Sequence, residues 1–290
     1  YHWTEIGMLA GYVMGGTSPD SNVIDKFLFS SNTTASDHGD LIISRMEFDG
    51  HSSHTHGYCS GGNNPVPVTY NNIDKFPFAS SSGATDFGDL TAVRYAASTS
   101  SSNTHGYTGC GTGPAGLQNI IDRFAFGSNA NASDVGDLTQ ARYASAGHSS
   151  ETHGFVSGGY PPITNVVQKF SFAASGNASD HGDLSTASYY VQGHSAVTDG
   201  YTSGGYSPSQ TNVVNKFSYA SNTTATSHGT LSAAHYGGGC SQTETTAFIG
   251  GGIDSSPTAS IKTFSFASAN SNATHGNLSL ARRKSAGCND

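Results

Sequence analysis

Short hydrophobic segments recur along the chain at a nearly constant spacing. Two aromatic residues, separated by one residue, return every 46–49 residues, at Phe27/Phe29, Phe76/Phe78, Phe124/Phe126, Phe170/Phe172, Phe217/Tyr219 and Phe264/Phe266. Clusters of Gly, Asn, Ser and Asp separate these segments. Short runs of aromatic and β-branched residues between turn-forming residues predict β-strands. No stretch keeps the 3.6-residue period of an amphipathic helix.

Each repeat contains four such segments. In one copy they are residues 141–148, 152–159, 165–172 and 179–184. Four strands in about 47 residues, repeated six times, predict an all-β fold. We expect residues 1–290 to form a single six-bladed β-propeller with four-stranded antiparallel blades. One blade cannot bury both of its faces, so the aromatic residues should pack between neighbouring blades.

The two ends of the sequence belong to the same repeat. The chain opens on a segment of the second type, residues 11–16, and ends on one of the first type, residues 281–288. We therefore expect the C-terminal strand to pair with the N-terminal strand and close the ring, which leaves no exposed sheet edge between blades. The chain begins at Tyr1 and not at Met, so we expect a processed form, part of a longer polypeptide, or only its ordered part.

Small residues fill the first segment of each repeat, as in Gly237-Gly238-Gly239, which is typical of strands crowded around a propeller axis. Gly-Gly doublets end the second segment in five copies, and the third copy has Cys110-Gly111 instead. Pro77 lies inside a predicted strand and has no N–H to donate, so we expect a bulge or a lost pairing there.

The repeats resemble those of Kelch-type β-propellers over essentially the whole chain. The resemblance rests on the Gly-Gly doublet, on a basic-aromatic step such as Lys169-Phe170, and on an Arg that opens the innermost strand. In chain order, that last position holds Arg45, Arg94, Arg142, Ser188, His235 and Arg282. Kelch repeats usually carry a Trp in the outer strand, where this chain has Gly-Asp-Leu. The Asp-His-Gly-Asp-Leu motif is also similar to repeats in tail and virion proteins of marine bacteriophages.

Composition narrows the possible partners. Twelve Lys and Arg residues against twenty Asp and Glu residues give a net charge of −8, and only 11% of residues are charged. A chain so poor in basic groups is not expected to bind nucleic acid or anionic lipid. No apolar run reaches the ~18 residues that a membrane-spanning helix needs, so we expect no membrane insertion. Four cysteines without CxxC spacing favour free, buried thiols.

Paired carboxylates recur in the Asp-x-Gly-Asp-Leu turns, for example at Asp37/Asp40 and Asp180/Asp183. Such pairs can bind Ca²⁺ or act as the acid and base of a glycosidase, and the turn is similar to the Asp-box of sialidase-like propellers. The last two copies have Ser227/Thr230 and Thr274/Asn277 instead. Because those residues keep the oxygen and lose the charge, we favour a turn-capping role.

Histidines gather in the hairpins that follow the first segments. His51, His54 and His56 flank one hairpin, and His148 and His153 flank another. We consider His51, His54 and His56 weak candidates for a metal site, since opposed imidazoles can share Zn²⁺. Other copies have Ser or Thr at these positions, which favours a structural role, and we expect no cofactor. We expect the phased Arg residues to bridge backbone and carboxylate groups and not to form an anion site.

The segments after the Gly-Gly positions differ in length and content, and they should all emerge on one face of the ring. We take Tyr70, Tyr160, Tyr206, Pro161 and Asn63 as candidate ligand-binding residues, because exposed aromatic rings beside amides and hydroxyls suit sugars. Six Asn-x-Ser/Thr sequons are present, at Asn32, Asn131, Asn177, Asn222, Asn272 and Asn277.

The sequence contains no nucleophile elbow, Walker sequence or HExxH motif. We therefore expect a non-enzymatic binding or structural propeller, extracellular or on a virion surface, that recognises a glycan or protein through its variable loops. Two alternatives stay open. One is a sialidase-like glycan-cleaving enzyme, and the other is a purely structural subunit of a lattice or fibre, in contact with other virion or fibre subunits.

Overall fold

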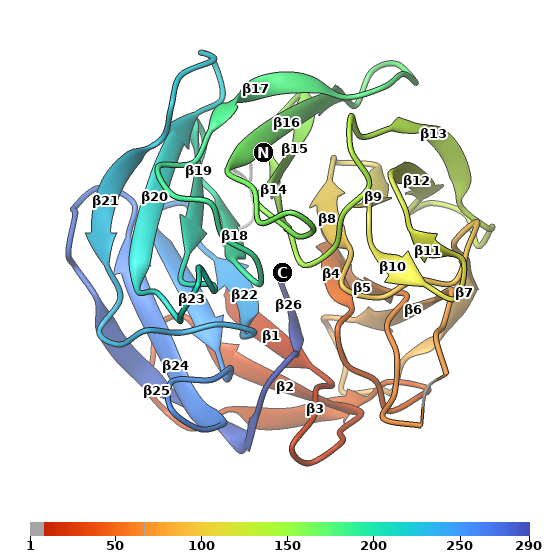
Figure 1. The fold of residues 1–290 in the computed structure, drawn as a ribbon. Helices are drawn as coiled ribbons and strands as arrows, with labels where there is room; N and C mark the ends of the chain where they lie inside the picture. The colour runs from red at the N-terminus through yellow and green to blue at the C-terminus, as the bar shows by residue number, and fades with distance from the viewer. Residues whose placement is uncertain (1–8, 67) are drawn as a thin grey trace.

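The computed structural model describes residues 9–66 and 68–290. These residues contain no helix, and hence none that could span a membrane. Their strands form six four-stranded antiparallel sheets around a central axis, so the chain is a six-bladed β-propeller (Figure 1). The fold class, the number of blades and the number of strands per blade were all predicted correctly from the repeats.

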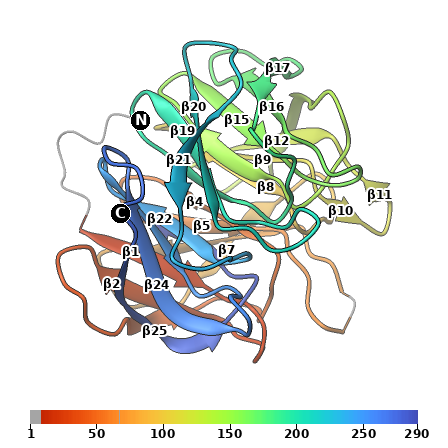
Figure 2. The same ribbon diagram turned by 60° about the vertical axis from the view of Figure 1, so that its left-hand side comes forward.

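We number the blades in chain order and give each from its innermost strand outward. Blade 1 is β26 (Ala286–Asn289), β1 (Ala10–Met14), β2 (Val23–Leu28) and β3 (Ser36–Asp40); blade 2 is β4 (Asp49–Ser52), β5 (His56–Ser60), β6 (Asn72–Pro77) and β7 (Thr85–Asp89); blade 3 is β8 (Ser98–Ser101), β9 (His105–Gly109), β12 (Ile120–Ala125) and β13 (Ser133–Asp137). Blade 4 is β14 (Ala146–Ser149), β15 (His153–Ser157), β16 (Val166–Ser171) and β17 (Ser179–Asp183); blade 5 is β18 (Gln192–Ser195), β19 (Asp199–Ser203), β20 (Val213–Ser218) and β21 (Thr226–Thr230); blade 6 is β22 (Gly239–Gln242), β23 (Thr246–Gly250), β24 (Thr258–Ser265) and β25 (Ala273–Arg282). Blade 3 also carries a short hairpin, β10 (Thr112–Gly113) and β11 (Gly116–Leu117), which projects at the edge of the molecule (Figure 2).

The two ends of the chain build blade 1 together. Strand β26 pairs with β1 in a register that runs from Gly11↔Asn289 to Met14↔Ala286. Beyond this ladder, Asp290 Oδ1 accepts hydrogen bonds from the backbone N–H of Leu9 at 2.8 Å and of Ala10 at 2.9 Å. The predicted closure of the ring by the C-terminal strand is therefore confirmed.

The core lies between the blades. An aromatic ring on the second strand of each blade packs on the second ring of the aromatic pair of the next blade, with centroids 4.6–4.8 Å apart. The six contacts are Tyr12–Phe78, Tyr58–Phe126, Tyr107–Phe172, Phe155–Tyr219, Tyr201–Phe266 and Phe248–Phe29. Because the last contact joins blade 6 to blade 1, the aromatic core is continuous around the ring.

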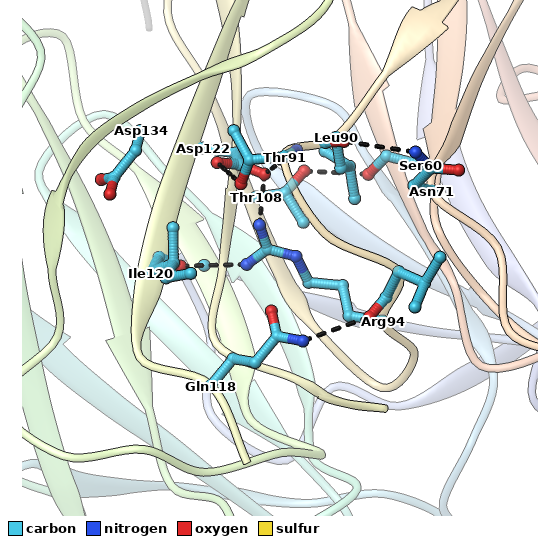
Figure 3. Close-up of polar contacts among 12 residues, drawn as sticks. Ser60, Asn71, Leu90, Thr91, Arg94, Thr108, Gln118, Ile120, Asp122 and Asp134 are labelled. Atoms are coloured by element: carbon cyan, nitrogen blue, oxygen red, sulfur yellow. Dashed lines mark hydrogen bonds and ion pairs between the residues drawn. The ribbon is translucent and has the colours of Figure 1, made fainter. Parts of the chain in front are cut away.

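Buried ion pairs anchor the connections between blades. Arg94 precedes β8, pairs with Asp122 on β12, and donates to the carbonyl oxygen of Ile120 at 3.1 Å (Figure 3). Asp122 also accepts the N–H of Thr91 at 2.9 Å, from the segment that arrives from blade 2. The same arrangement recurs in Arg45–Asp74 at 2.6 Å and Arg282–Asp25 at 2.8 Å. These arginines thus have the bridging role that the sequence predicted.

The other three blades vary this anchor. Blade 4 keeps Arg142 but has Gln168 on its third strand, and no group in the described residues bonds Arg142 Nε or Nη2. Blade 5 has Ser188 and Asn215 at these positions. In blade 6, Asp254 Oδ1 binds His235 Nδ1 at 2.8 Å and Lys262 Nζ at 2.9 Å.

The inner strands pack backbone against backbone. A Cβ atom at Gly147 would lie 1.9 Å from the carbonyl oxygen of Thr99 in the neighbouring inner strand, so only glycine fits there. The hydroxyl of Thr99 in turn donates to the carbonyl oxygen of Gly50 at 2.9 Å. The crowding of the inner strands at the axis, which the small residues predicted, is confirmed.

The prediction of a bulge or lost pairing at Pro77 is wrong. Pro77 ends β6 and stays in register with His56. Because Phe78 N–H donates to Thr55 on the β5 side, the missing N–H of Pro77 would point toward β7, whose pairing already ends at Lys75↔Thr85. Proline therefore costs no ladder bond. The register shift lies between Ile73 and Asp74.

All four cysteines are free, and Cys59, Cys110 and Cys288 are buried, as expected. Burial raises the pKa of Cys59 to about 12, so its thiol stays protonated.

Candidate functional site

One face of the propeller, here called the loop face, carries two connections in every blade. One joins the second strand to the third, and the other leads from the preceding blade into the innermost strand. Single β-bridges join the two connections within each blade, at Thr17↔Arg283, Met46↔Asn63, Tyr95↔Thr112, Tyr143↔Tyr160, Tyr189↔Tyr206 and Tyr236↔Ile253.

Six tyrosines from blades 4, 5 and 6 form one continuous group on this face, here called the tyrosine cluster: Tyr143, Tyr160, Tyr189, Tyr190, Tyr206 and Tyr236. Neighbouring ring centroids lie 5.4–6.3 Å apart. Tyr189 is central, because its ring contacts those of Tyr160, Tyr190 and Tyr206. Tyr160 is 39% exposed and the other five rings are half-buried. The cluster is therefore a partly accessible aromatic surface.

A polar bridge lies beside the cluster. The hydroxyl of Tyr190 donates to Glu47 Oε1 at 2.6 Å, and Lys284 Nζ lies 2.7 Å from the same oxygen. Lys284 Nζ is also 5.8 Å from the centroid of the Tyr190 ring. Glu47 precedes the inner strand of blade 2 and Tyr190 that of blade 5, on the opposite side of the ring. The bridge thus crosses the axis at the loop-face end of an axial cavity of about 190 Å³.

The backbone beneath these side chains forms a collar. The residue two positions before each inner strand has a left-handed φ value of 50–70°, at Glu47, Ala96, Ala144, Tyr190, Gly237 and Lys284. Backbone hydrogen bonds of 2.6–3.0 Å link them in five of the six steps around the ring. Five of the six residues are not glycine, so this conformation is held against its usual cost. The collar fixes where Glu47, Tyr190 and Lys284 project.

The phenols of Tyr143, Tyr189 and Tyr190 are neutral donors. Burial raises the pKa of Tyr190, and the charge of Glu47 raises it further. Burial and the neighbouring tyrosines raise the pKa of Tyr143 and of Tyr189. The site therefore offers ring faces and hydroxyl groups, with one carboxylate and one ammonium at its edge.

The candidate ligand-binding residues fall into two groups. Tyr160 and Tyr206 belong to the tyrosine cluster, and Pro161 follows Tyr160 in the same loop. Tyr70 and Asn63 lie in blade 2, where the hydroxyl of Tyr70 accepts a hydrogen bond from Asn64 Nδ2 at 2.8 Å and no ring of the described residues contacts Tyr70. Asn63 is half-buried, and its backbone pairs with Met46 and Thr69.

The paired carboxylates do not lie at the axis. They are on the outermost strands, where Asp37 Oδ1 accepts the N–H of Gly39 at 2.8 Å and Asp134 Oδ1 accepts that of Gly136 at 3.0 Å. Ser227 does the same for Gly229 at 3.3 Å, without a charge. These contacts are those of turn caps, and they give the glycosidase hypothesis no pair of convergent acids. Two sequon residues, Asn131 and Asn177, accept a backbone N–H of the neighbouring blade through Oδ1.

The structure does not bring the histidine candidates together. His51 is buried within blade 2, with Nε2 3.0 Å from Ser60 Oγ, whereas His56 Nδ1 lies 2.8 Å from Thr55 Oγ1 and His54 is exposed. Across residues 9–66 and 68–290, no three His, Cys, Asp or Glu side chains are grouped in a way that could hold a metal ion.

Sequence reasoning missed most of the site. It identified Tyr160 and Tyr206 through loop variability, but not Tyr143, Tyr189 or Tyr236. Those three share a signal, since each directly follows the phased position at Arg142, Ser188 and His235. Glu47 and Lys284 left no comparable signal, because they meet only across the ring.

Comparison with models of known protein families found no match, and comparison with curated proteins found no significantly similar sequence.

Proposed function

We propose that this protein is a non-enzymatic recognition module that binds glycans through the loop face. The tyrosine cluster is the observation that carries the proposal. Aromatic faces pack on the C–H faces of sugar rings, while phenol hydroxyls bond sugar hydroxyls. Six such rings lie in contact, and Tyr160 is the most exposed of them. The collar supports the proposal, because a surface fixed in advance loses little entropy on binding.

The setting that we propose is a virion or another extracellular surface. The likeness of the repeats to Kelch-type propellers and to tail and virion proteins of marine bacteriophages supports it, as does the low content of charged side chains. A glycan on a cell or on another protein would then be the partner. The acidic net charge of −8 argues against nucleic acid as that partner.

A glycan array followed by titration tests this function. Tyr160→Ala and Tyr206→Ala should each weaken binding of the selected glycan roughly 2- to 10-fold, since an aromatic contact contributes about 0.5–1.5 kcal/mol. Tyr70→Ala is the matched control: it removes a loop-face tyrosine outside the cluster and should leave binding unchanged. No binding to any glycan on a broad array, or an equal loss of affinity in all three variants, would refute glycan recognition by the cluster.

A further inference from the structure

The axial cavity contains a carboxylate that the repeat does not explain. Asp49 is the first residue of β4 and lines the cavity of about 190 Å³. At about 30 Å³ per molecule, this cavity has room for roughly six waters. The equivalent first residues of the other inner strands are Ser98, Ala146, Gln192, Gly239 and Ala286, all uncharged. Blade packing therefore does not require a carboxylate at this position.

Asp49 is half-buried and differs from the fully buried carboxylates of the protein. Asp25, Asp74, Asp122 and Glu47 each pair with an Arg or Lys. Within the described part of the chain, the carboxylate of Asp49 has neither a hydrogen bond nor an ion pair, whereas its backbone pairs with Ser60 in the β4–β5 ladder. An ionised carboxylate removed from bulk water is costly unless a counter-charge accompanies it, and burial accordingly raises its pKa to about 7.

The cavity wall supplies hydrogen-bond acceptors but no free cation. Gln192 Oε1 and Ser285 Oγ belong to lining residues, are buried, and have no partner among the described residues. Lys284 is the one Lys or Arg among the described lining residues, and Glu47 already holds its ammonium group. Across the cavity, burial raises the pKa of Cys240, so its thiol adds no charge. The described wall therefore has one carboxylate without a counter-charge and two unpartnered side-chain oxygens, of which the hydroxyl of Ser285 can donate as well as accept.

We propose that the axial cavity binds a small primary ammonium ligand, with Asp49 as its counter-ion. One carboxylate matches one positive charge, and the three donors of an –NH₃⁺ group suit the carboxylate together with the unpartnered oxygens of Gln192 and Ser285. A divalent metal fits less well, because Ca²⁺ needs six to eight oxygen ligands and usually several carboxylates. Asp49 lies outside the tyrosine cluster, although Tyr190 of that cluster also lines the cavity, and the proposal does not rest on glycan binding.

Ethylammonium chloride is a suitable probe, since its three non-hydrogen atoms fit the cavity. Calorimetric titration at pH 8, with ionic strength held by NaCl, should give saturable binding to the wild-type protein. Asp49→Asn should weaken that binding at least tenfold. Asp49→Ser, which installs the residue of blade 3, should weaken it equally, and it guards against a folding defect in the first variant.

Thermal melting without ligand separates this role from a structural one. If Asp49 serves a ligand, both variants should melt at or above the wild-type temperature, because they remove a half-buried carboxylate that has no counter-charge. Lower melting of both variants, absence of saturable binding to the wild type, or equal binding to all three proteins would overturn the proposal. Saturable binding of CaCl₂ in place of ethylammonium, lost in both variants, would overturn the ligand class.

Discussion

At the scale of single residues, the third position of the inner strand holds a buried histidine in three of the six blades. The third residue of the inner strand is His51, His148 or His194 in three blades, and each imidazole Nε2 lies 2.8–3.1 Å from a serine hydroxyl on the adjacent strand. Burial lowers the pKa of these histidines to about 3, about 4 and about 3. They are therefore neutral in the folded protein.

These histidines make stability depend on pH. Between pH 6.5 and about 4, these histidines bind protons in the unfolded chain but not in the folded protein. Their contribution to the free energy of unfolding is therefore fully present above pH 6.5. It falls on acidification by about 1.4 kcal/mol per pH unit for each histidine. His148→Ser, which installs the residue found at Ser100 and Ser241, should make this dependence shallower. Urea unfolding between pH 7 and pH 4.5 measures it, and an unchanged slope would contradict the assignment.

The unpaired Arg142 gives a second prediction at this scale. It is 1% exposed, and the structure places no carboxylate of the described residues within ion-pair distance of it. Gln168→Asp restores the residue that blade 3 has at Asp122, and it should raise stability by about 1–3 kcal/mol, because a buried charge without a partner is costly. Calorimetric melting at pH 7 tests this. Gln168→Asn is the control of equal length, and a rise no larger than in that control would disprove the ion pair.

Single residues also show where sequence reasoning works. The role of Asp37 followed from its replacement by Ser and Thr, since such a substitution keeps the hydrogen bond and removes the charge. Pro77 was misjudged because sequence shows that an N–H is missing, but not which way it would point. The partners of Glu47 could not be predicted, because Tyr190 is 143 residues away and approaches from the opposite blade.

At the scale of elements, the strands and their order could be predicted from the sequence, because the same four segments follow one another in every repeat. The β10–β11 hairpin was not predicted, since it occurs once and its four paired residues include two glycines. Of all the elements, β26 has the most distant partner, because it joins blade 1 across the whole length of the chain.

Removal of β26 should therefore have a large effect. Truncation after Ser285 deletes the inner strand of blade 1, including buried Ala286 and Cys288, and we expect loss of folding or a melting temperature at least ~10 °C lower. Truncation after Asn289 removes only Asp290, whose side chain caps Leu9 and Ala10 and whose backbone N–H donates to Ala10, and it should lower the melting temperature by a few degrees. Circular dichroism melting compares the two, and similar melting of both proteins would argue against a sealing role for β26.

At the scale of the whole molecule, the position of the site follows from the ring. All variable connections emerge on one face because every blade repeats the same path, and this could be predicted. That blades 4, 5 and 6 combine their tyrosines, while blades 1 and 2 have Arg283 and Met46 at the equivalent positions, is visible only when the blades are placed side by side.

The aromatic contact between blade 6 and blade 1 also constrains how such a protein can change over generations. An open array of repeats can gain or lose a unit at either end, where a polar cap limits the damage. Here every unit has two neighbours and no terminal unit exists, so a duplication or deletion would alter the tilt of all the others at once. The closed ring therefore disfavours changes in the number of repeats, and sequence variation is tolerated best in the exposed connections.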